Sequence, residues 1–168
     1  MPRLQLLRPG HAPALLAFES ENRAYFAASI PDRGDEYFAH FAARHEELLA
    51  EQATGLCFFH LLVESDGEVL GRFNLVDVAD GRAELGYRVG ERAAGRGLAT
   101  AGVRQVCALA ATEYGLTGLH ARTTLDNTAS RAVLARTGFT PRGEVELSGR
   151  PGLRYERSLA DEAVRRLR

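Results

Sequence analysis

Residues Arg92–Thr100 read RAAGRGLAT, and this stretch decides the fold. A strand-like run, AELGYRV at Ala83–Val89, precedes it, and an amphipathic helical pattern over Leu98–Tyr114 follows it. Gly95 and Gly97 therefore fall at a strand-to-helix turn, where glycine permits positive φ and a close approach of the backbone to a ligand. The stretch predicts a turn whose backbone can contact a bound molecule.

The charges of this turn favour an anionic ligand. The first turn of a helix leaves backbone N–H groups unpaired, and the helix dipole favours an anion there. Arg92 and Arg96 add positive charge, so we interpret the turn as a pyrophosphate cradle. An ordinary helix start with a flexible turn is the alternative that this stretch alone leaves open.

Two common phosphate-binding classes do not fit the turn. No Lys-Ser/Thr pair follows the glycines, which argues against a P-loop nucleotide hydrolase. A dinucleotide-binding fingerprint needs three glycines early in a βαβ unit, and this turn does not have them. The spacing Arg92-x-x-Gly95-x-Gly97 is therefore interpreted together with the rest of the chain.

The composition indicates one globular domain over residues 1–168, with a core from about residue 4 to residue 159. Hydrophobic residues make up 45% of the 168 residues, and the net charge is −1. This charge provides no general basic field for nucleic acid, and no apolar run is long enough to span a membrane. The N-terminal sequence MPRLQLLRPG lacks the apolar core of a signal peptide, so we expect a cytoplasmic protein.

The cysteines and histidines predict no metal site. Cys57 and Cys107 show neither metal-ligand spacing nor a disulfide framework, which suits a reducing compartment. The histidines are scattered along the chain, and we expect His60 and His120 to be packed strand residues. No metal is therefore expected to be required.

Apolar periodicity and turn residues predict the element order β-α-α-β-β-β-α-β-α-β-β. The expected strands are 4–7, 57–64, 69–78, 82–89, 119–124, 140–147 and 153–159. The expected helices are 13–21, 35–52, 98–114 and 128–137. Residues 22–30 are expected to be irregular, 148–152 to form a loop and 160–168 to form a tail. The Asp-Gly pairs at 66–67 and 80–81 are hairpin signals.

A second block, LDNTASRAVLARTGF at Leu125–Phe139, has the features of a capped helix. Asn127 is a typical N-cap, and Gly138 is typical of the position that ends a helix. The block resembles the N-x-x-S-x-x-V-L-x-x-x-G-F block of the ribosomal-protein (Rim-type) branch of the GNAT superfamily of N-acetyltransferases. The first stretch resembles the Q/R-x-x-G-x-G/A acetyl-CoA motif of the same superfamily. Both stand at the matching place in the order of elements, and the resemblance covers residues 4–159.

This resemblance implies a mixed α/β fold in a single domain. Its central, mostly antiparallel seven-stranded sheet would carry a strand–loop–helix acetyl-CoA site. The implied activity is an acetyl-CoA-dependent N-acetyltransferase, in which a primary amine attacks the thioester directly in a ternary complex. The acceptor would be a protein N-terminal amine, ribosomal or other, or a small-molecule amine. A monomer or homodimer with no direct nucleic-acid or membrane partner is expected. A non-catalytic acetyl-CoA-binding module is the alternative, and a nucleotide-binding regulator is a third.

The resemblance also assigns residues to the cofactor. Backbone groups of Tyr87, Arg88 and Val89 would face the pantetheine arm, since the strand is expected to separate there from its neighbour. Asn127 would form a hydrogen bond near the pantetheine, and its role as a helix cap is compatible with this. The residues implied for the pyrophosphate are Arg92, Gly95, Arg96, Gly97, Leu98, Ala99 and Thr100.

The departing thiolate needs a group that neutralises it. Many GNAT enzymes place a Tyr four residues before the Gly of the Gly-Phe pair, and here that position is Leu134. The resemblance implies that Ser130, the Ser of the N-x-x-S pattern, takes this part. A second capping group at the start of the helix is an equal alternative for Ser130.

Glu84 is the candidate base for the amine proton, because it lies just before the cofactor strand. A carboxylate in an apolar cleft can have a raised pKa suited to base work, usually through a water. A surface ion pair with Arg72 or Arg82 is the alternative for this residue. Glu144 and Glu146, in the strand after the second block, are rival bases.

A small acidic cluster, Asp32, Asp35 and Glu36, lies between the two early helices. In the GNAT fold this region borders the acceptor cleft, so the cluster could attract a cationic amine. The plainer interpretation is a solvated helix start, where acidic residues are favoured by the dipole.

Overall fold

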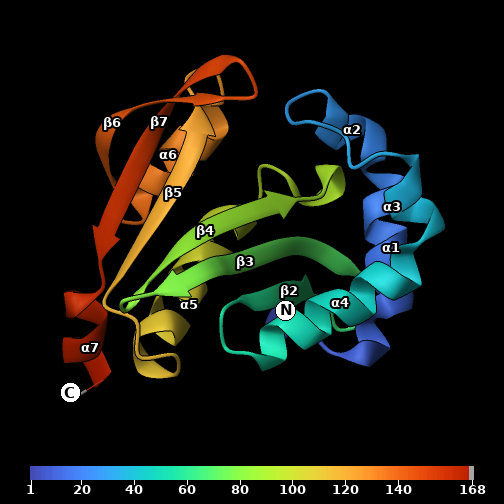
Figure 1. Cartoon of the computed structure of the whole chain (residues 1–168), viewed down its shortest axis with the longest axis horizontal. Coiled ribbons are helices and arrows are strands. Elements are labelled where there is room, and N and C mark those ends of the chain that lie inside the picture. Colours follow the sequence, from blue (N-terminus) through green and yellow to red (C-terminus); the bar gives the residue numbers. More distant parts are fainter. Residues whose placement is uncertain (167–168) are drawn as a thin grey trace. The chain divides into compact units, whose positions relative to one another are not determined.

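The predicted order of strands is present in the computed structural model, which describes residues 1–166 (Figure 1). Within these residues, seven strands form one mostly antiparallel sheet in the order β1-β2-β3-β4-β5-β7-β6. The strands are β1 (Arg3–Leu6), β2 (Phe58–Val63), β3 (Val69–Ala79), β4 (Arg82–Val89), β5 (Gly118–Thr124), β6 (Thr140–Leu147) and β7 (Arg150–Ser158). The mixed α/β fold with a seven-stranded sheet is thereby confirmed.

In the described part of the chain, four helices follow β1, the other three come after β4, β5 and β7, and the chain divides into two compact units. The helices are α1 (Ala12–Glu21), α2 (Arg23–Ala27), α3 (Asp35–Ala39), α4 (Phe41–Ala53), α5 (Leu98–Thr112), α6 (Thr128–Arg136) and α7 (Ala160–Arg166). The first unit comprises Met1–Asn74 and Tyr87–Leu98, and the second comprises Leu75–Gly86 and the chain from Ala99 onward.

In the first unit, helix α4 is tied to the first two strands by hydrogen bonds from its side chains to the backbone. The Gln52 amide donates to the carbonyl of Leu7 at 3.0 Å and accepts from the N–H of Phe59 at 2.8 Å. The Nε2 atom of buried His45 lies 3.1 Å from the carbonyl of Arg8. Because β1 and β2 pair antiparallel, Gln52 links the helix both to β2 and to the residue that follows β1.

The single helix expected over residues 35–52 is wrong, because the helix is broken at His40. That residue has φ −115° and ψ 28°, which are not helical values. The five residues of α3 before the break are not buried, whereas α4 buries Phe41 and Leu48. The buried side chains of α4 therefore fix its orientation, whereas α3 has no buried side chain that would keep it in line with α4.

The stretch expected to be irregular at 22–30 also differs, since it contains the short helix α2. Its Phe26 is buried, and the ring packs against Phe18 of α1 with the ring centroids 5.5 Å apart. This contact with a residue of the preceding helix stabilises a helical turn that local sequence alone does not indicate.

The core of the first unit is mostly apolar and includes a neutral histidine on β2. The largest fully buried apolar side chains of this unit are Leu15, Leu61, Leu62 and Phe73. His60 is 1% exposed, and its Nδ1 lies 3.0 Å from the carbonyl of Phe73. Burial lowers the pKa of His60 to about 4, so its ring is neutral at physiological pH. The expectation that His60 is a packed strand residue is confirmed.

In the second unit, α5 forms the crossover between the parallel strands β4 and β5. Strand β7 lies between β5 and β6 and is antiparallel to both. Helix α5 turns Val103, Val106, Cys107 and Ala110 to the interior, all fully buried. The predicted apolar face of this helix is therefore confirmed for these four positions.

Two expectations near the C-terminus are wrong. The loop expected at 148–152 is a two-residue turn, in which Ser148 has φ 50° and Gly149 has φ 76°, and β7 begins at Arg150. Positive φ at both positions is what a tight hairpin turn of the primed type requires. The tail expected at 160–168 contains α7 over its described residues, where Glu162 is buried and bonded to Arg157 at 2.9 Å.

We predict that Gly152→Ala destabilises the fold by about 1–3 kcal/mol, because the added methyl has no room. A Cβ at Gly152 would lie 2.7 Å from the backbone oxygen of Thr123 on β5. Gly143→Ala is the matched control, since a Cβ there meets no heavy atom within 4 Å. Urea unfolding of both variants checks this, and equal free energies of unfolding would contradict it.

Candidate functional site

The turn after β4 has the conformation that requires both of its glycines. Strand β4 ends at Val89, a 3₁₀ turn covers Glu91–Ala93, and α5 begins at Leu98. Gly95 has φ 76° and Gly97 has φ 73°, values that strain residues with a side chain. A Cβ at either glycine would meet no heavy atom within 4 Å. The backbone of the turn is therefore open to a ligand.

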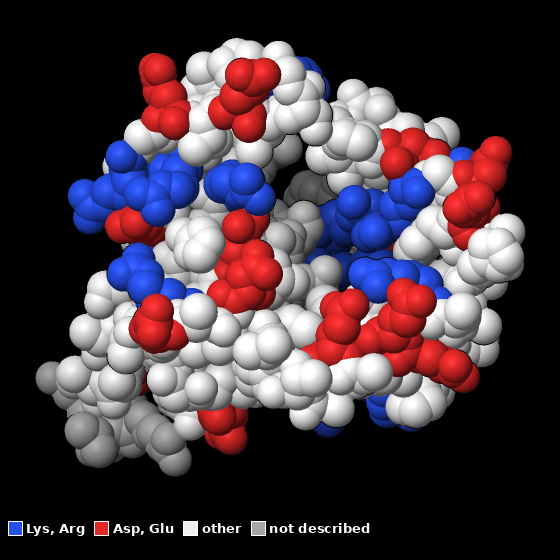
Figure 2. Space-filling view, in the orientation of Figure 1, with Lys and Arg blue, Asp and Glu red and all other residues white. Residues whose placement is uncertain are grey.

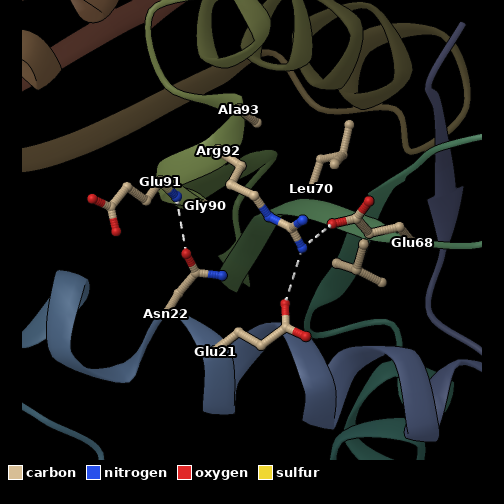
Figure 3. Close-up of a pocket in the computed structure, with 9 residues that line it drawn as sticks. Glu21, Asn22, Glu68, Leu70, Gly90, Glu91, Arg92 and Ala93 are labelled. Atoms are coloured by element: carbon tan, nitrogen blue, oxygen red, sulfur yellow. Dashed lines mark hydrogen bonds and ion pairs between the residues drawn. The ribbon is translucent and has the colours of Figure 1, made fainter.

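The start of the turn is held in place by Asn22, at the end of α1. Its Oδ1 accepts from the N–H of Glu91 at 2.9 Å, as Figure 3 shows, and its Nδ2 donates to the carbonyl of Phe18 at 2.9 Å. The N–H of Gly90 donates to the carbonyl of Leu70 on β3 at 2.9 Å. Since a Cβ at Gly90 would lie 3.1 Å from Asn22, glycine allows this close approach.

Arg92, assigned to the pyrophosphate, is turned toward two carboxylates (Figure 3). Its Nη2 lies 3.0 Å from Glu68 and 3.4 Å from Glu21, at one side of a pocket of about 320 Å³. The Arg92 side chain is 77% exposed, and exposed pairs of this kind contribute about 0–1 kcal/mol. The guanidinium can therefore leave these partners for an anion at little cost, and Arg96 is exposed as well.

The end of β4, assigned to the pantetheine, is supported from β3. A Cβ at Gly71 would lie 3.1 Å from the carbonyl oxygen of Arg88 and 3.4 Å from the side chain of Val89. The ring of Tyr87 stacks on Phe73 with an interplanar angle of 13°. Gly71 thus lets β3 approach closely the strand segment that carries the proposed cofactor contacts.

A buried ion cluster, which the sequence analysis missed, surrounds Glu19 of α1. Glu19 is 1% exposed, and its Oε1 accepts from Nη1 of Arg72 at 3.0 Å. Its Oε2 lies 3.0 Å from Nε of Arg33 and 3.4 Å from Nη1 of Arg88. These residues are far apart in the sequence and share no motif. One sequence feature could have indicated the cluster: Arg72 lies within the mostly apolar run Val69–Leu75, and a charge in a buried strand needs a partner of opposite charge.

Burial and charge act in opposite directions on this cluster. Burial acts to raise the pKa of Glu19, but the hydrogen bond to Arg33 and the charges of Arg33, Arg72 and Arg88 hold it below its usual value. Burial, and then the positive charge of Arg33, lowers the pKa of Arg88 to about 10. Both groups are therefore charged at neutral pH.

In the second unit, Glu84 is bonded to two residues of β5. Its Oε1 accepts from Arg122 at 3.1 Å and 2.9 Å, and its Oε2 lies 3.4 Å from Nε2 of His120. The ion pair weighed as the alternative for Glu84 exists, but Arg72 and Arg82 as its partners are wrong. The parallel register places Glu84 opposite His120, and the β4–β5 ladder comprises three residue pairs that end there.

The start of α6 confirms Asn127 as a helix cap. Its Oδ1 accepts from the backbone N–H of Ser130 at 3.1 Å. The preceding Asp126 forms an ion pair with Arg150 of β7. Leu134, at the position where the sequence comparison with GNAT enzymes led us to look for a Tyr, is 1% exposed and belongs to the core. Leu134 therefore packs in the core, and its hydrocarbon side chain cannot act as an acid.

The other predicted acidic residues lie at the surface. Glu144 and Glu146 are exposed on β6. Asp32 and Asp35 of the early acidic cluster are each bonded to Nη2 of Arg23 at 2.8 Å. Arg23 lowers the pKa of Asp32 through this hydrogen bond. The cluster is therefore neutralised in part from within the chain, which weakens it as a site for a cationic amine.

The assigned residues are distributed over both units. Tyr87 to Leu98 lie in the first unit, and Glu84, Ala99, Thr100, Asn127 and Ser130 lie in the second. Across residues 1–166, the His, Cys, Asp and Glu side chains form no group of three suited to a metal ion. None of the described helices has the length and hydropathy needed to cross a bilayer.

Comparison with protein families agrees with this arrangement of turn, strand and helix. The model of the acetyltransferase (GNAT) domain matches residues 3–140. The chain belongs to the GNAT acetyltransferase family. This match includes β1 to β5, the glycine turn and the capped helix α6.

Three relatives of this GNAT chain illustrate the match. The ribosomal-protein-S5-alanine acetyltransferase from Vibrio fischeri has a TM-score of 0.89 at 18% identity, over 95% of this chain and 94% of that one. RimJ from Mycobacterium smegmatis, solved with CoA-disulfide, has a TM-score of 0.81 at 25% identity, over 98% and 88%. The uncharacterised N-acetyltransferase p20 from Bacillus licheniformis is 32% identical over 87 residues. That last match spans 51% of this chain and 49% of p20, about half the length of the relative.

We predict that Glu19→Gln lowers the free energy of unfolding by about 3–5 kcal/mol, because it leaves buried guanidinium groups without their counterion. Glu47→Gln on α4 is the control, since Glu47 is exposed and pairs with exposed Arg44. It should change stability by less than about 0.5 kcal/mol. Urea unfolding at neutral pH measures both, and an equal effect would contradict the structural role of Glu19.

We also predict that the difference in unfolding free energy between wild type and Glu19→Gln depends on pH. Because the folded-state pKa of Glu19 is below its ordinary value of 4.5, its carboxylate contributes stability above that value. The contribution is lost as the pH falls through the folded-state pKa. The difference between wild type and Glu19→Gln should therefore be constant near pH 7 and shrink below about pH 4.5. A difference that stays constant into acid would show that Glu19 does not titrate in this way.

Proposed function

We propose that the protein is an acetyl-CoA-dependent N-acetyltransferase that transfers an acetyl group to a primary amine. The observation that carries this proposal is the turn at Gly95 and Gly97, which combines positive φ, open space and the N-terminus of α5. Membership of the GNAT family, in which RimJ was solved with CoA-disulfide, supports acetyl-CoA as the ligand of this turn.

In this proposal the turn binds the pyrophosphate through backbone N–H groups. The N–H groups of Leu98, Ala99 and Thr100 begin α5 and have no partners within the helix. Arg92 and Arg96 add side-chain charge. The backbone of Tyr87, Arg88 and Val89 would bond the amides of the pantetheine arm, much as an added strand bonds a sheet edge. Asn127, already the cap of α6, would donate its amide to the same arm.

The reaction follows from the chemistry of a thioester and an amine. The amine nitrogen attacks the carbonyl carbon, the carbon–sulfur bond breaks, and CoA leaves as a thiolate. The nitrogen loses one proton, and the thiolate gains one. A covalent acyl-cysteine is not part of the proposal, because Cys57 and Cys107 are both buried. Burial also raises the pKa of the Cys107 thiol to about 11.

Glu84 stays our candidate for the proton acceptor, acting through a water. Its carboxylate is shared between Arg122 and His120. Glu144 and Glu146 are exposed on β6 and remain rival bases. Ser130 is our candidate for the hydrogen bond to the departing sulfur, because Leu134 is buried and offers no donor.

The acceptor in this proposal is a protein N-terminal amine or a small-molecule amine. The name of the Vibrio fischeri neighbour describes acetylation of a ribosomal-protein alanine, and its identity to this chain is 18%. A non-catalytic acetyl-CoA-binding module is the second candidate, and the buried Leu134 in place of a phenol favours it. Release of CoA in the presence of amines and N-terminal peptides distinguishes the two.

We predict that Gly97→Asn strongly weakens acetyl-CoA binding while the protein stays folded. Asn tolerates the left-handed conformation, so the φ of 73° costs little, but its side chain blocks the approach of the pyrophosphate. Titration calorimetry should show at least about a hundredfold weaker binding.

Gly115→Asn is the matched control, because Gly115 has φ 66° after α5 and is also free of neighbours within 4 Å. It introduces the same side chain in the same conformation outside the turn, so affinity should be unchanged. Unchanged affinity in Gly97→Asn would overturn the pyrophosphate assignment.

We predict that Glu84→Gln lowers kcat by about a hundredfold or more and removes the lower limb of its pH profile, because the amide keeps the shape but cannot accept the proton. Acetyl-CoA affinity and the melting temperature should change little, since the Glu84 ion pairs are partly exposed. Steady-state kinetics over a range of pH measure this effect.

Ser130→Ala is the companion variant in the same assay. It should lower kcat without changing the pH profile, since the hydroxyl acts on sulfur rather than on the amine proton. An unchanged pH profile in Glu84→Gln would transfer the base role to Glu144, Glu146 or solvent.

A further inference from the structure

The first unit holds more buried positive charge than the proposed cofactor chemistry uses. Three guanidinium groups, of Arg33, Arg72 and Arg88, converge on the single carboxylate of Glu19. Arg72 is 3% exposed, and its Nε is buried without a hydrogen-bond partner among the described residues. One carboxylate cannot compensate three arginines, and an uncompensated charge away from water is costly.

Charges outside the cluster reduce this excess but do not remove it. Arg23 is paired with Asp32 and Asp35 beside the cluster, at the exposed surface. Together with the cluster, this makes four arginines and three carboxylates, so one positive charge remains. The excess lies at the buried end, around Arg72 and Arg88, where solvent screens it least. Figure 2 shows basic side chains gathered near α1 and α3, with acidic side chains around them.

Aromatic rings hold the arginines in fixed positions. The guanidinium of Arg88 lies over the ring of Phe26 at 4.7 Å, and that of Arg33 lies over Tyr37 at 4.8 Å. The Tyr37 hydroxyl accepts from Nη1 of Arg72 at 3.3 Å. Because a ring covers one face of Arg33 and one face of Arg88, the edges of these two guanidinium groups are the parts available for hydrogen bonds, which suits planar recognition of a carboxylate.

The cluster is accessible to a ligand from one side. The side chain of Arg33 is 27% exposed and that of Arg88 is 20% exposed. A small pocket opens beside them, and its charged lining residues are Glu19, Arg23, Asp32, Arg33 and Arg88. Arg72 does not line this pocket, and Asp32 is already paired with Arg23. Arg88 also belongs to the strand segment that we assign to the pantetheine, so an anion held here would lie next to the acetyl donor.

We propose that Arg33 and Arg88, next to the buried Arg72, form an anion subsite that binds a carboxylate of the acceptor. The acceptor is then an amine that also carries a negative charge, such as an amino acid or a peptide with an acidic residue near its N-terminus. A polyamine would meet these arginines with like charge and is disfavoured. The inference rests on the proposed acetyltransferase function and names the substrate class for it.

The test uses pairs of acceptors that differ in one negative charge. The pairs are alanine with alaninamide, and the amidated tripeptides Ala-Asp-Ala and Ala-Asn-Ala, with spermidine as the cationic amine. Within each pair of acceptors that is acetylated, we expect kcat/KM to be at least about tenfold higher for the member with the additional carboxylate. This is the size of effect expected for a hydrogen bond to a charged group. Equal rates within the pairs, or preferred turnover of spermidine, would overturn the inference.

Variants of Arg33 test whether the cluster causes the preference for acceptors with an additional carboxylate. Arg33 is the most exposed of the three arginines, so Arg33→Gln should fold, which circular dichroism checks. It should reduce the preference within a pair to about twofold, and Arg33→Lys should restore part of it. Arg44→Gln, which removes an exposed arginine of α4, should leave the preference intact. A preference that persists in Arg33→Gln contradicts the proposal.

Binding measurements separate this inference from the proposed function. Acetyl-CoA affinity should be the same in wild type and Arg33→Gln, and a loss of affinity would mean that the cluster binds a phosphate of CoA instead. If no amine is acetylated, the proposed function fails. Calorimetry with N-acetylated Ala-Asp-Ala and Ala-Asn-Ala then decides the subsite. Tighter binding of the acidic peptide that Arg33→Gln abolishes supports the inference, and equal binding overturns it.

Discussion

The first unit depends on one buried carboxylate. Glu19 projects from α1 and bonds Arg72 of β3, Arg88 of β4 and Arg33 of the segment before α3. These contacts join segments that are separated by many residues in the chain. They also compensate the charged groups for the hydration that these groups lose on burial. Because the protein interior leaves charges unscreened, the position of Glu19 fixes the positions of the arginines, and with them the end of β4 that leads into the glycine turn.

The turn itself is held by weaker, local contacts. Asn22, three residues after Glu19, fixes the N–H of Glu91, and Gly90 gives it the room to do so. Beyond that point the turn relies on the left-handed conformation of Gly95 and Gly97 rather than on side-chain packing. A turn built in this way presents backbone donors and leaves the adjacent space open, which is what an extended anionic ligand needs.

Local sequence signals failed where burial or a contact with a neighbouring element decided the structure. Periodicity favoured one helix across His40, but burial acts on α4 alone and leaves α3 separate. The residues of α2 carry no helical pattern, and Phe26 becomes ordered by packing on Phe18. The residues expected as a tail from 160 contain α7, because Glu162 finds its partner in Arg157. For α2 and α7, a residue outside the element supplies the stabilising contact.

The sequence by itself determined where the seven strands lie along the chain, the glycine turn and the cap of α6, because these follow from short-range rules of glycine conformation, apolar alternation and helix capping. Only the tertiary structure decided the partners of charged groups. It paired Glu84 with Arg122 and His120, turned Arg92 to Glu21 and Glu68, and gathered three arginines on Glu19. Coulombic attraction has no fixed sequence spacing, so the pairing of charges depends on which strands and helices the fold brings together.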